Sequence, residues 1–172
     1  MRVIKITAFI VLAVICFASP FFTWVPSIIS GIEFSANCGD YLKLSADATN
    51  VKIAEKHLTK AIDYLEKNNL TSGYTKIFVY YPKNDIGLWY ENLKETQTEL
   101  SAMLEKEEIT ELEESNMLMK LRETILDNGG CVTRPDGISL HPNYTVMFWL
   151  NLTLWLLWIL GGFACYWAYW EW

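Results

Sequence analysis

Side chains suited to catalysis are sparse in this sequence. It has two histidines, His57 and His141, and neither lies in a metal-binding spacing such as HExxH. Carboxylates are plentiful, but they follow helical patterns, whereas acid–base catalysis needs two of them facing each other inside a cleft. Phosphate-binding loops, nucleophile elbows and dinucleotide fingerprints are missing from the sequence. We therefore expect a protein that is not an enzyme, with no cofactor and no metal site.

Cysteines are the second reactive group. Two of the four, Cys38 and Cys131, lie on either side of the charged middle of the chain. Their separation fits neither a redox CxxC motif nor a zinc site. If the middle of the chain is extracytoplasmic, a structural disulfide between them is the simplest interpretation. Two unpaired buried thiols are the alternative.

A glutamate-rich run extends from Glu105 to Glu114. A solvated helix face is the simplest interpretation, and attraction of a basic partner or weak binding of divalent cations is the alternative. The run lacks the alternating acidic spacing of a calcium loop. Thr110 and Glu113 match a capping box, which predicts a kink or a helix restart within the run.

The charge distribution divides the chain into three parts. All charged residues except Arg2, Lys5 and Glu171 lie between positions 31 and 144, and the formal net charge is -6. An acidic middle argues against binding of nucleic acid, which needs a basic surface. The domains predicted from this distribution are 1–30, 31–143 and 144–172.

The two outer parts have the composition of transmembrane helices. Residues 1–30 fit an uncleaved signal anchor better than a cleaved signal peptide, because the apolar stretch continues beyond Pro20. Residues 144–172 form the clearest apolar run, with a Trp- and Tyr-rich end. Arg2 and Lys5 place both termini in the cytoplasm, so the middle part is expected outside the plasma membrane (the inner membrane in a bacterium).

The middle part is expected to be mainly α-helical, as an antiparallel helical hairpin. After a turn at 32–37, the first helix is predicted from Asp40 to Lys67, with a heptad-like apolar seam. The second helix starts near Ile86 and stops before Gly129. A short extended segment, 74–81, is predicted at the tip, and a small β-hairpin, 131–140, near the base.

Aromatic residues gather at two places, which we take as candidate partner-binding surfaces. One is the predicted tip, where the cluster either plugs the hairpin as a small core or forms an exposed docking patch. The other is the second transmembrane helix, where Asn151 in hydrocarbon needs a partner and paired glycines permit close helix approach. The candidate residues are Tyr74, Phe78, Tyr80, Tyr81, Trp89, Tyr90, Trp149, Asn151, Trp155, Gly161 and Gly162.

These features predict a non-enzymatic integral membrane protein. The leading hypothesis is an accessory or scaffold subunit that binds a larger membrane complex, or copies of itself, through the second transmembrane helix and the aromatic tip. A pore- or ring-forming homo-oligomer is one alternative, and an extracytoplasmic ligand-sensing module is another. Membrane lipids and other membrane subunits are the expected partners.

Overall fold

The computed structural model describes residues 24–78 and 80–170. This part of the chain is mainly α-helical and divides into two compact units. Residues 30–142 form one unit, which we call the head. Most of the predicted first transmembrane helix lies outside the described residues.

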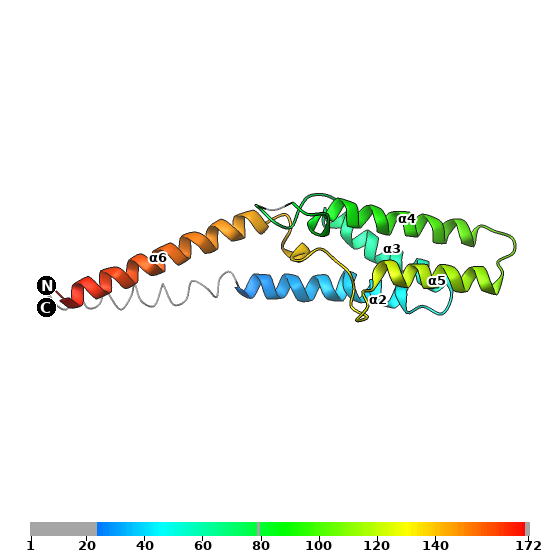
Figure 1. Ribbon diagram of the computed structural model, residues 1–172, viewed down its shortest axis with the longest axis horizontal. Helices are drawn as coiled ribbons and strands as arrows, with labels where there is room; N and C mark the ends of the chain where they lie inside the picture. Colours follow the sequence, from blue (N-terminus) through cyan, green and yellow to red (C-terminus); the bar gives the residue numbers. More distant parts are fainter. Residues whose placement is uncertain (1–23, 79, 171–172) are drawn as a thin grey trace. The chain divides into compact units, whose positions relative to one another are not determined.

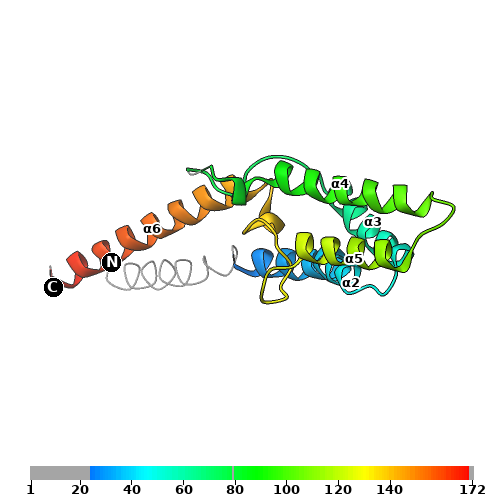
Figure 2. The same cartoon turned by 45° about the vertical axis from the view of Figure 1, so that its right-hand side comes forward.

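Four α-helices of different lengths lie wholly within the described part of the head. They are α2 (Asp40–Ala46), α3 (Val51–Lys67), α4 (Ile86–Leu104) and α5 (Glu111–Ile125). Successive helices run in opposite directions, as Figures 1 and 2 show. α3 packs against the other three, and α2 also packs against α5. The predicted two-helix hairpin is therefore wrong in detail, because each of its arms is folded back on itself.

The start of the head also differs from the prediction. Residues 24–34 are helical, and a π-helical turn, Ser35–Gly39, leads directly into α2. The predicted turn at 32–37 is absent, and Asp40 lies within continuous helix, with helical φ and ψ values of -67° and -37°. A helix that continues keeps its backbone groups bonded internally, so the chain needs no cap here.

The apolar seam of α3 confirms the helical pattern from Val51 onwards. One face of this helix is buried, and it carries Val51, Ala54, Leu58, Ala61, Ile62 and Leu65. Ahead of this point the predicted seam fails, because Leu44 and Asp47 are exposed. The change marks the place where the chain reverses.

The reversal between α2 and α3 is built from polar side chains. Asn50 is extended and accepts a hydrogen bond from the Ile53 N–H through Oδ1 at 2.8 Å, so it caps α3. The Ser45 hydroxyl, buried on α2, donates to the Ala54 carbonyl at 2.7 Å. This bond ties the two helices together at their junction.

The second reversal lies in the glutamate-rich run. The predicted capping box is confirmed, since the Glu113 N–H donates to Thr110 Oγ1 at 3.3 Å and the Thr110 N–H donates to the Glu113 carboxylate at 3.1 Å. It starts a new helix after a break at 105–110. The chain reverses its direction at this break, so α5 packs against α4, α2 and α3.

No strand occurs in the described residues, where only two isolated bridges are found, Tyr74 with Asp85 and Leu126 with Val132. The predicted β-hairpin at 131–140 is therefore wrong. The Thr133 N–H donates instead to the Ile125 carbonyl at the end of α5, at 2.8 Å. A left-handed Gly137, with φ of 82°, then leads into a short 3₁₀ helix, Ile138–Leu140. The segment is therefore attached to the end of α5 at Thr133 and continues as turns and a short 3₁₀ helix, instead of pairing as two strands.

The second unit contains α6 (Tyr144–Trp170), a helix of 27 residues. Over Thr145–Phe163 it is long and apolar enough to cross a membrane, and it is the one helix of the described residues that meets this criterion.

Candidate interaction surface

The aromatic loop, which we define as residues 70–85, connects α3 to α4. It is closed at its neck by two backbone hydrogen bonds, from the Thr75 N–H to the Asn84 carbonyl at 3.0 Å and from the Ile86 N–H to the Gly73 carbonyl at 2.9 Å. Gly73 has a φ of 104°, a conformation that favours glycine. The predicted extended segment is thus an ordered loop and not a strand in its described part.

Four aromatic side chains of this loop are exposed, and Tyr74, at 42%, is the least exposed of them. Phe78 is 70% exposed, Tyr80 65% and Tyr81 61%. Tyr74 packs edge-to-face on Tyr80, with ring centroids 4.8 Å apart. A hydrogen bond to the Asp85 carboxylate raises the pKa of Tyr74, which keeps its hydroxyl protonated as a donor. The loop therefore exposes its aromatic rings to solvent, while hydrogen bonds at its neck hold its backbone in place.

Two lysines, Lys76 and Lys83, lie in the same loop. They are the only charged residues of the sequence between Thr71 and Asn84. Lys83 is exposed and Lys76 is half-buried. Within the described residues neither lysine forms an ion pair, whereas other lysines of the head pair with glutamates. With Asp85 at its end, the aromatic loop carries two lysines against one carboxylate, in a protein whose formal net charge is -6.

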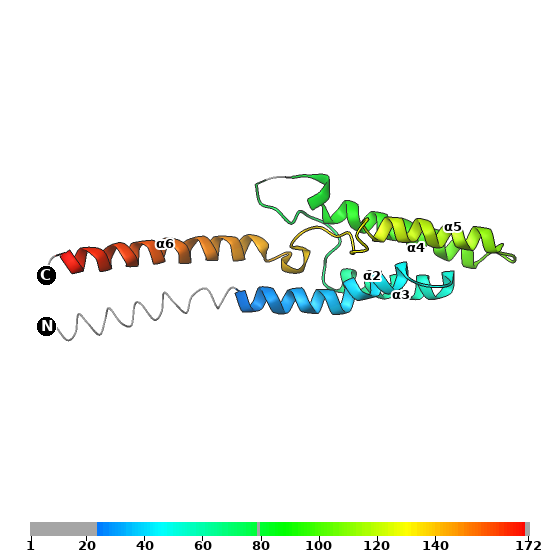
Figure 3. The same cartoon turned by 60° about the horizontal axis from the view of Figure 1, so that its bottom comes forward.

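The loop lies at the end of the head where the chain leaves it. A Cβ atom placed on Gly73 would be 2.8 Å from Cε1 of His141, so the loop backbone touches the last residues of the head. Burial lowers the pKa of His141, which favours the neutral imidazole. The turn at 47–50 and the break at 105–110 lie at the opposite end, as Figures 1 and 3 show. We call these the proximal and distal ends.

Contacts among other parts of the head define the proximal end further. Arg134 lies over the Phe34 ring, with its guanidinium carbon 5.2 Å from the centroid, and Phe34 packs edge-to-face on Tyr64 at 6.1 Å. The start of the head, the end of α3 and the segment 126–142 therefore meet there. The aromatic loop, which was predicted at the tip of the hairpin, therefore lies at the proximal end of the head. The prediction placed it at the opposite end.

Trp89 and Tyr90 do not join the exposed rings. The Trp89 indole N–H donates to the Thr133 carbonyl at 2.8 Å and holds the segment 126–142 to α4. The Tyr90 hydroxyl donates to Glu66 at 2.6 Å. Both side chains are half-buried, and each forms a hydrogen bond within the head.

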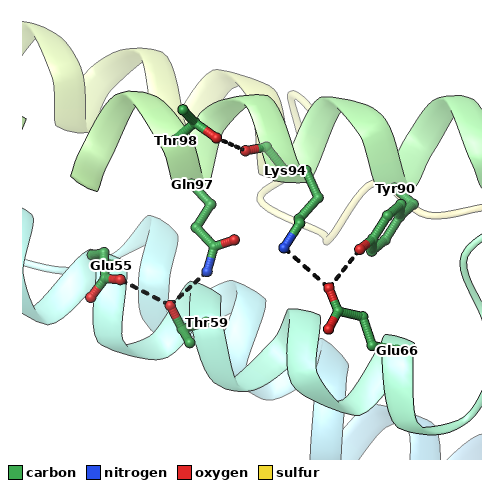
Figure 4. Close-up of polar contacts among 7 residues, drawn as sticks. All are labelled: Glu55, Thr59, Glu66, Tyr90, Lys94, Gln97 and Thr98. Atoms are coloured by element: carbon green, nitrogen blue, oxygen red, sulfur yellow. Dashed lines mark hydrogen bonds and ion pairs between the residues drawn. The ribbon is translucent and has the colours of Figure 1, made fainter. Parts of the chain in front are cut away.

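Glu66 lies at the centre of a polar contact between α3 and α4 (Figure 4). It also pairs with Lys94 at 3.1 Å. The hydrogen bonds from Tyr90 and Lys94 hold the pKa of Glu66 below its ordinary value. Burial and the Glu66 carboxylate raise the pKa of Tyr90 to about 12. One turn further along α4, Gln97 donates to the Thr59 hydroxyl at 2.8 Å.

The predicted disulfide is not formed, since both thiols are free. Cys38 is buried in the core on the π-helical turn, and burial raises its pKa to about 12, opposed by the nearby Arg134 charge. Cys131 is exposed, in a turn where its N–H donates to Asp127 Oδ1 at 2.8 Å. The two cysteines therefore lie in different surroundings, Cys38 in the core and Cys131 at the surface.

On α6, the candidate residues are placed as follows. Trp149 and Trp155 are exposed, and a Cβ on Gly162 would meet no atom within 4 Å. The Asn151 amide N–H donates to the Met147 carbonyl one turn earlier, at 2.9 Å. The helix itself thus satisfies one of the amide's donors, which weakens the argument that Asn151 needs a second helix.

Spacing along α6 brings four of its residues onto one stripe. Asn151, Trp155, Trp158 and Gly162 are separated by four, three and four positions, so their side chains lie on one face. Trp155 and Trp158 also contact each other edge-to-face, with centroids 6.3 Å apart. Gly161 lies beside this stripe and Trp149 lies off it.

Among the described residues, no group of three or more histidine, cysteine, aspartate or glutamate side chains is placed to hold a metal ion. In the glutamate-rich run, Glu113 and Glu114 act as helix caps.

Comparisons of the chain with family models, with curated proteins and with solved structures found no match.

Sequence reasoning overlooked three features of the proximal end: the two lysines of the aromatic loop, the contact of Gly73 with His141, and the Arg134–Phe34 contact. The lysines could have been found, because they alternate with aromatic residues in a stretch free of acidic side chains. The two contacts join positions far apart in the sequence, so no local sequence pattern predicts them.

Proposed function

We propose that this chain is a non-enzymatic accessory or scaffold subunit, anchored in a membrane, that binds a larger membrane complex through α6. The observation that carries the proposal is the stripe on α6. A helix whose composition suits hydrocarbon carries a polar residue, two tryptophans and a glycine on one face, Asn151, Trp155, Trp158 and Gly162. Small and polar residues are enriched where membrane helices pack together.

The head supports this proposal by the way it uses its polar side chains. The carboxylates with the best-defined contacts bind within the fold: Glu66 binds Tyr90 and Lys94, and Glu114 binds the start of α3. Such contacts stabilise the helical fold of the head, which suits a scaffold whose surface is available to a partner. The orientation predicted from Arg2 and Lys5, with the head on the outer side of the membrane, belongs to the same proposal.

Gentle extraction of the native protein, followed by sizing and mass spectrometry, tests the proposal. We expect the chain to elute with one or more other membrane proteins in reproducible ratio. Co-elution only with further copies of itself would favour the ring-forming alternative. A lone monomer would refute both.

Two matched variants test the stripe. Gly162→Leu places a branched side chain on the stripe, where a neighbouring helix would approach, and we expect it to release the partner. Phe163→Leu introduces the same residue at the adjacent position, which lies about 100° away around the helix, and we expect it to leave the complex intact. Equal behaviour of the two variants would argue against the stripe.

A further inference from the structure

We infer that the aromatic loop is a lipid-interface anchor: its rings enter the headgroup region of an anionic membrane surface, and Lys76 and Lys83 bind lipid phosphates. The inference rests on the membrane attachment in the proposed function. It assigns the loop to lipid, where the sequence suggested a protein partner.

The side chains of the loop suit a membrane interface. Tyrosine combines an apolar ring with a polar hydroxyl, and such residues concentrate where one end of the side chain is apolar and the other is wet. Tyr80 and Tyr81 are exposed, and so is the ring of Phe78 in the same loop. Leaving three large rings in water is unfavourable, and burial in the acyl–headgroup boundary would remove them from it.

The charge of the loop favours an anionic partner. Lys76 and Lys83 flank the exposed rings, and each lysine near an anionic lipid surface contributes to binding. Lysine also extends its charge towards phosphate while its methylene chain stays on apolar surface. The acidic run at the distal end would be repelled by the same surface, so the charges favour the proximal end towards the lipid.

The position of the loop supplies the third argument. Its neck touches His141, which immediately precedes Pro142, the last residue of the head. The apolar span of the chain starts at Thr145. Because only a few residues separate the loop's contact from that span, the chain connection brings the loop within reach of the interface.

Site-specific photocrosslinking in the full-length protein tests the inference. The photoreactive residue p-benzoylphenylalanine replaces Phe78, Leu112 or Leu157 in turn, in nanodiscs of phosphatidylcholine with phosphatidylglycerol. Leu112, at the distal end, is 71% exposed and so matches Phe78 in exposure. Leu157 lies in the apolar span and reports membrane insertion. After irradiation, mass spectrometry identifies whatever is attached.

We expect phospholipid to be attached at positions 78 and 157 and not at position 112. Replacing Lys76 and Lys83 with glutamate should lower the yield at position 78 severalfold and leave the yield at position 157 unchanged. Lipid at 157 without lipid at 78 would overturn the inference and leave the proposed function standing. Attachment of a protein at position 78 would overturn the inference and indicate that the loop binds a protein partner. Absence of lipid at 157 would refute the membrane attachment and the inference together.

Discussion

Glu114 of α5 accepts a hydrogen bond from the backbone N–H of Val51, the first residue of α3, at 3.0 Å. The two residues are 63 positions apart in the sequence. The first N–H groups of a helix have no partner inside it, so a carboxylate there satisfies a donor and interacts favourably with the helix dipole. This bond joins the two reversals of the chain at the distal end of the head.

Replacing Glu114 with alanine should therefore destabilise the head. The Val51 N–H loses its acceptor, and the loss of a helix cap costs about 1 kcal/mol. Glu114→Gln keeps an acceptor oxygen without the charge and should cost less. Denaturant unfolding followed by circular dichroism measures both. Glu108→Ala, in the exposed break of the same run, should have almost no effect; an equal loss there would show that general charge, and not the cap, is responsible.

The contact of Glu66 with Tyr90 and Lys94 should make stability depend on acid pH. The pKa of Glu66 in the folded head lies below its ordinary value of 4.5. A carboxylate with a lowered pKa stabilises the fold above its unfolded pKa, and this contribution is lost as pH falls through the folded value. Wild type should therefore exceed Glu66→Gln in stability at pH 7, and the difference should shrink below about pH 4.5.

Unfolding curves of the two proteins across this pH range measure the effect. Glu91→Gln, at an exposed position of α4, is the control, because Glu91 takes no part in the contact of Glu66 with Tyr90 and Lys94 and should not alter the pH dependence. A difference between wild type and Glu66→Gln that stays constant down to pH values well below 4.5 would contradict the assignment.

Gly73→Ala should disturb the aromatic loop. The φ of 104° is unfavourable for alanine, and the added Cβ would lie 2.8 Å from the His141 ring. Strain of this kind costs about 1–3 kcal/mol. Gly130→Ala is the matched control, since its φ of 74° is also positive but its Cβ would meet no atom within 4 Å. Hydrogen exchange should rise at Thr75 and Ile86 in the first variant only; unchanged exchange would disprove the contact.

The two cysteines of the head should react differently with a thiol reagent. Cys131 is exposed, and Cys38 is buried with its pKa raised to about 12 by burial. Reactivity requires both access and thiolate. In the folded, unreduced protein a maleimide should label Cys131 and spare Cys38, and denaturant alone should expose Cys38. Peptide mapping reads each site. If labelling of both required a reductant, the two thiols would be bonded after all.

Prediction from sequence succeeded where the signal was local. The capping box at Thr110, the helix start near Ile86, the buried stripe from Val51 to Leu65 and the helix stop before Gly129 are all present. Each depends on residues within one or two helical turns. The reversal at 47–50 was missed because it contains no glycine or proline, and the heptad spacing continues across it through Asp47.

The sequence alone determined the mainly helical content, the apolar α6 and the starts of α4 and α5, because propensity, periodicity and capping act over a few residues. The tertiary structure decided the four-helix arrangement, the free thiols and the location of the aromatic loop at the proximal end. These depend on packing between distant segments, such as α5 on α2 and His141 on Gly73. A break in a helical pattern is compatible with a kink or a reversal, and only the burial gained by folding back selects between them.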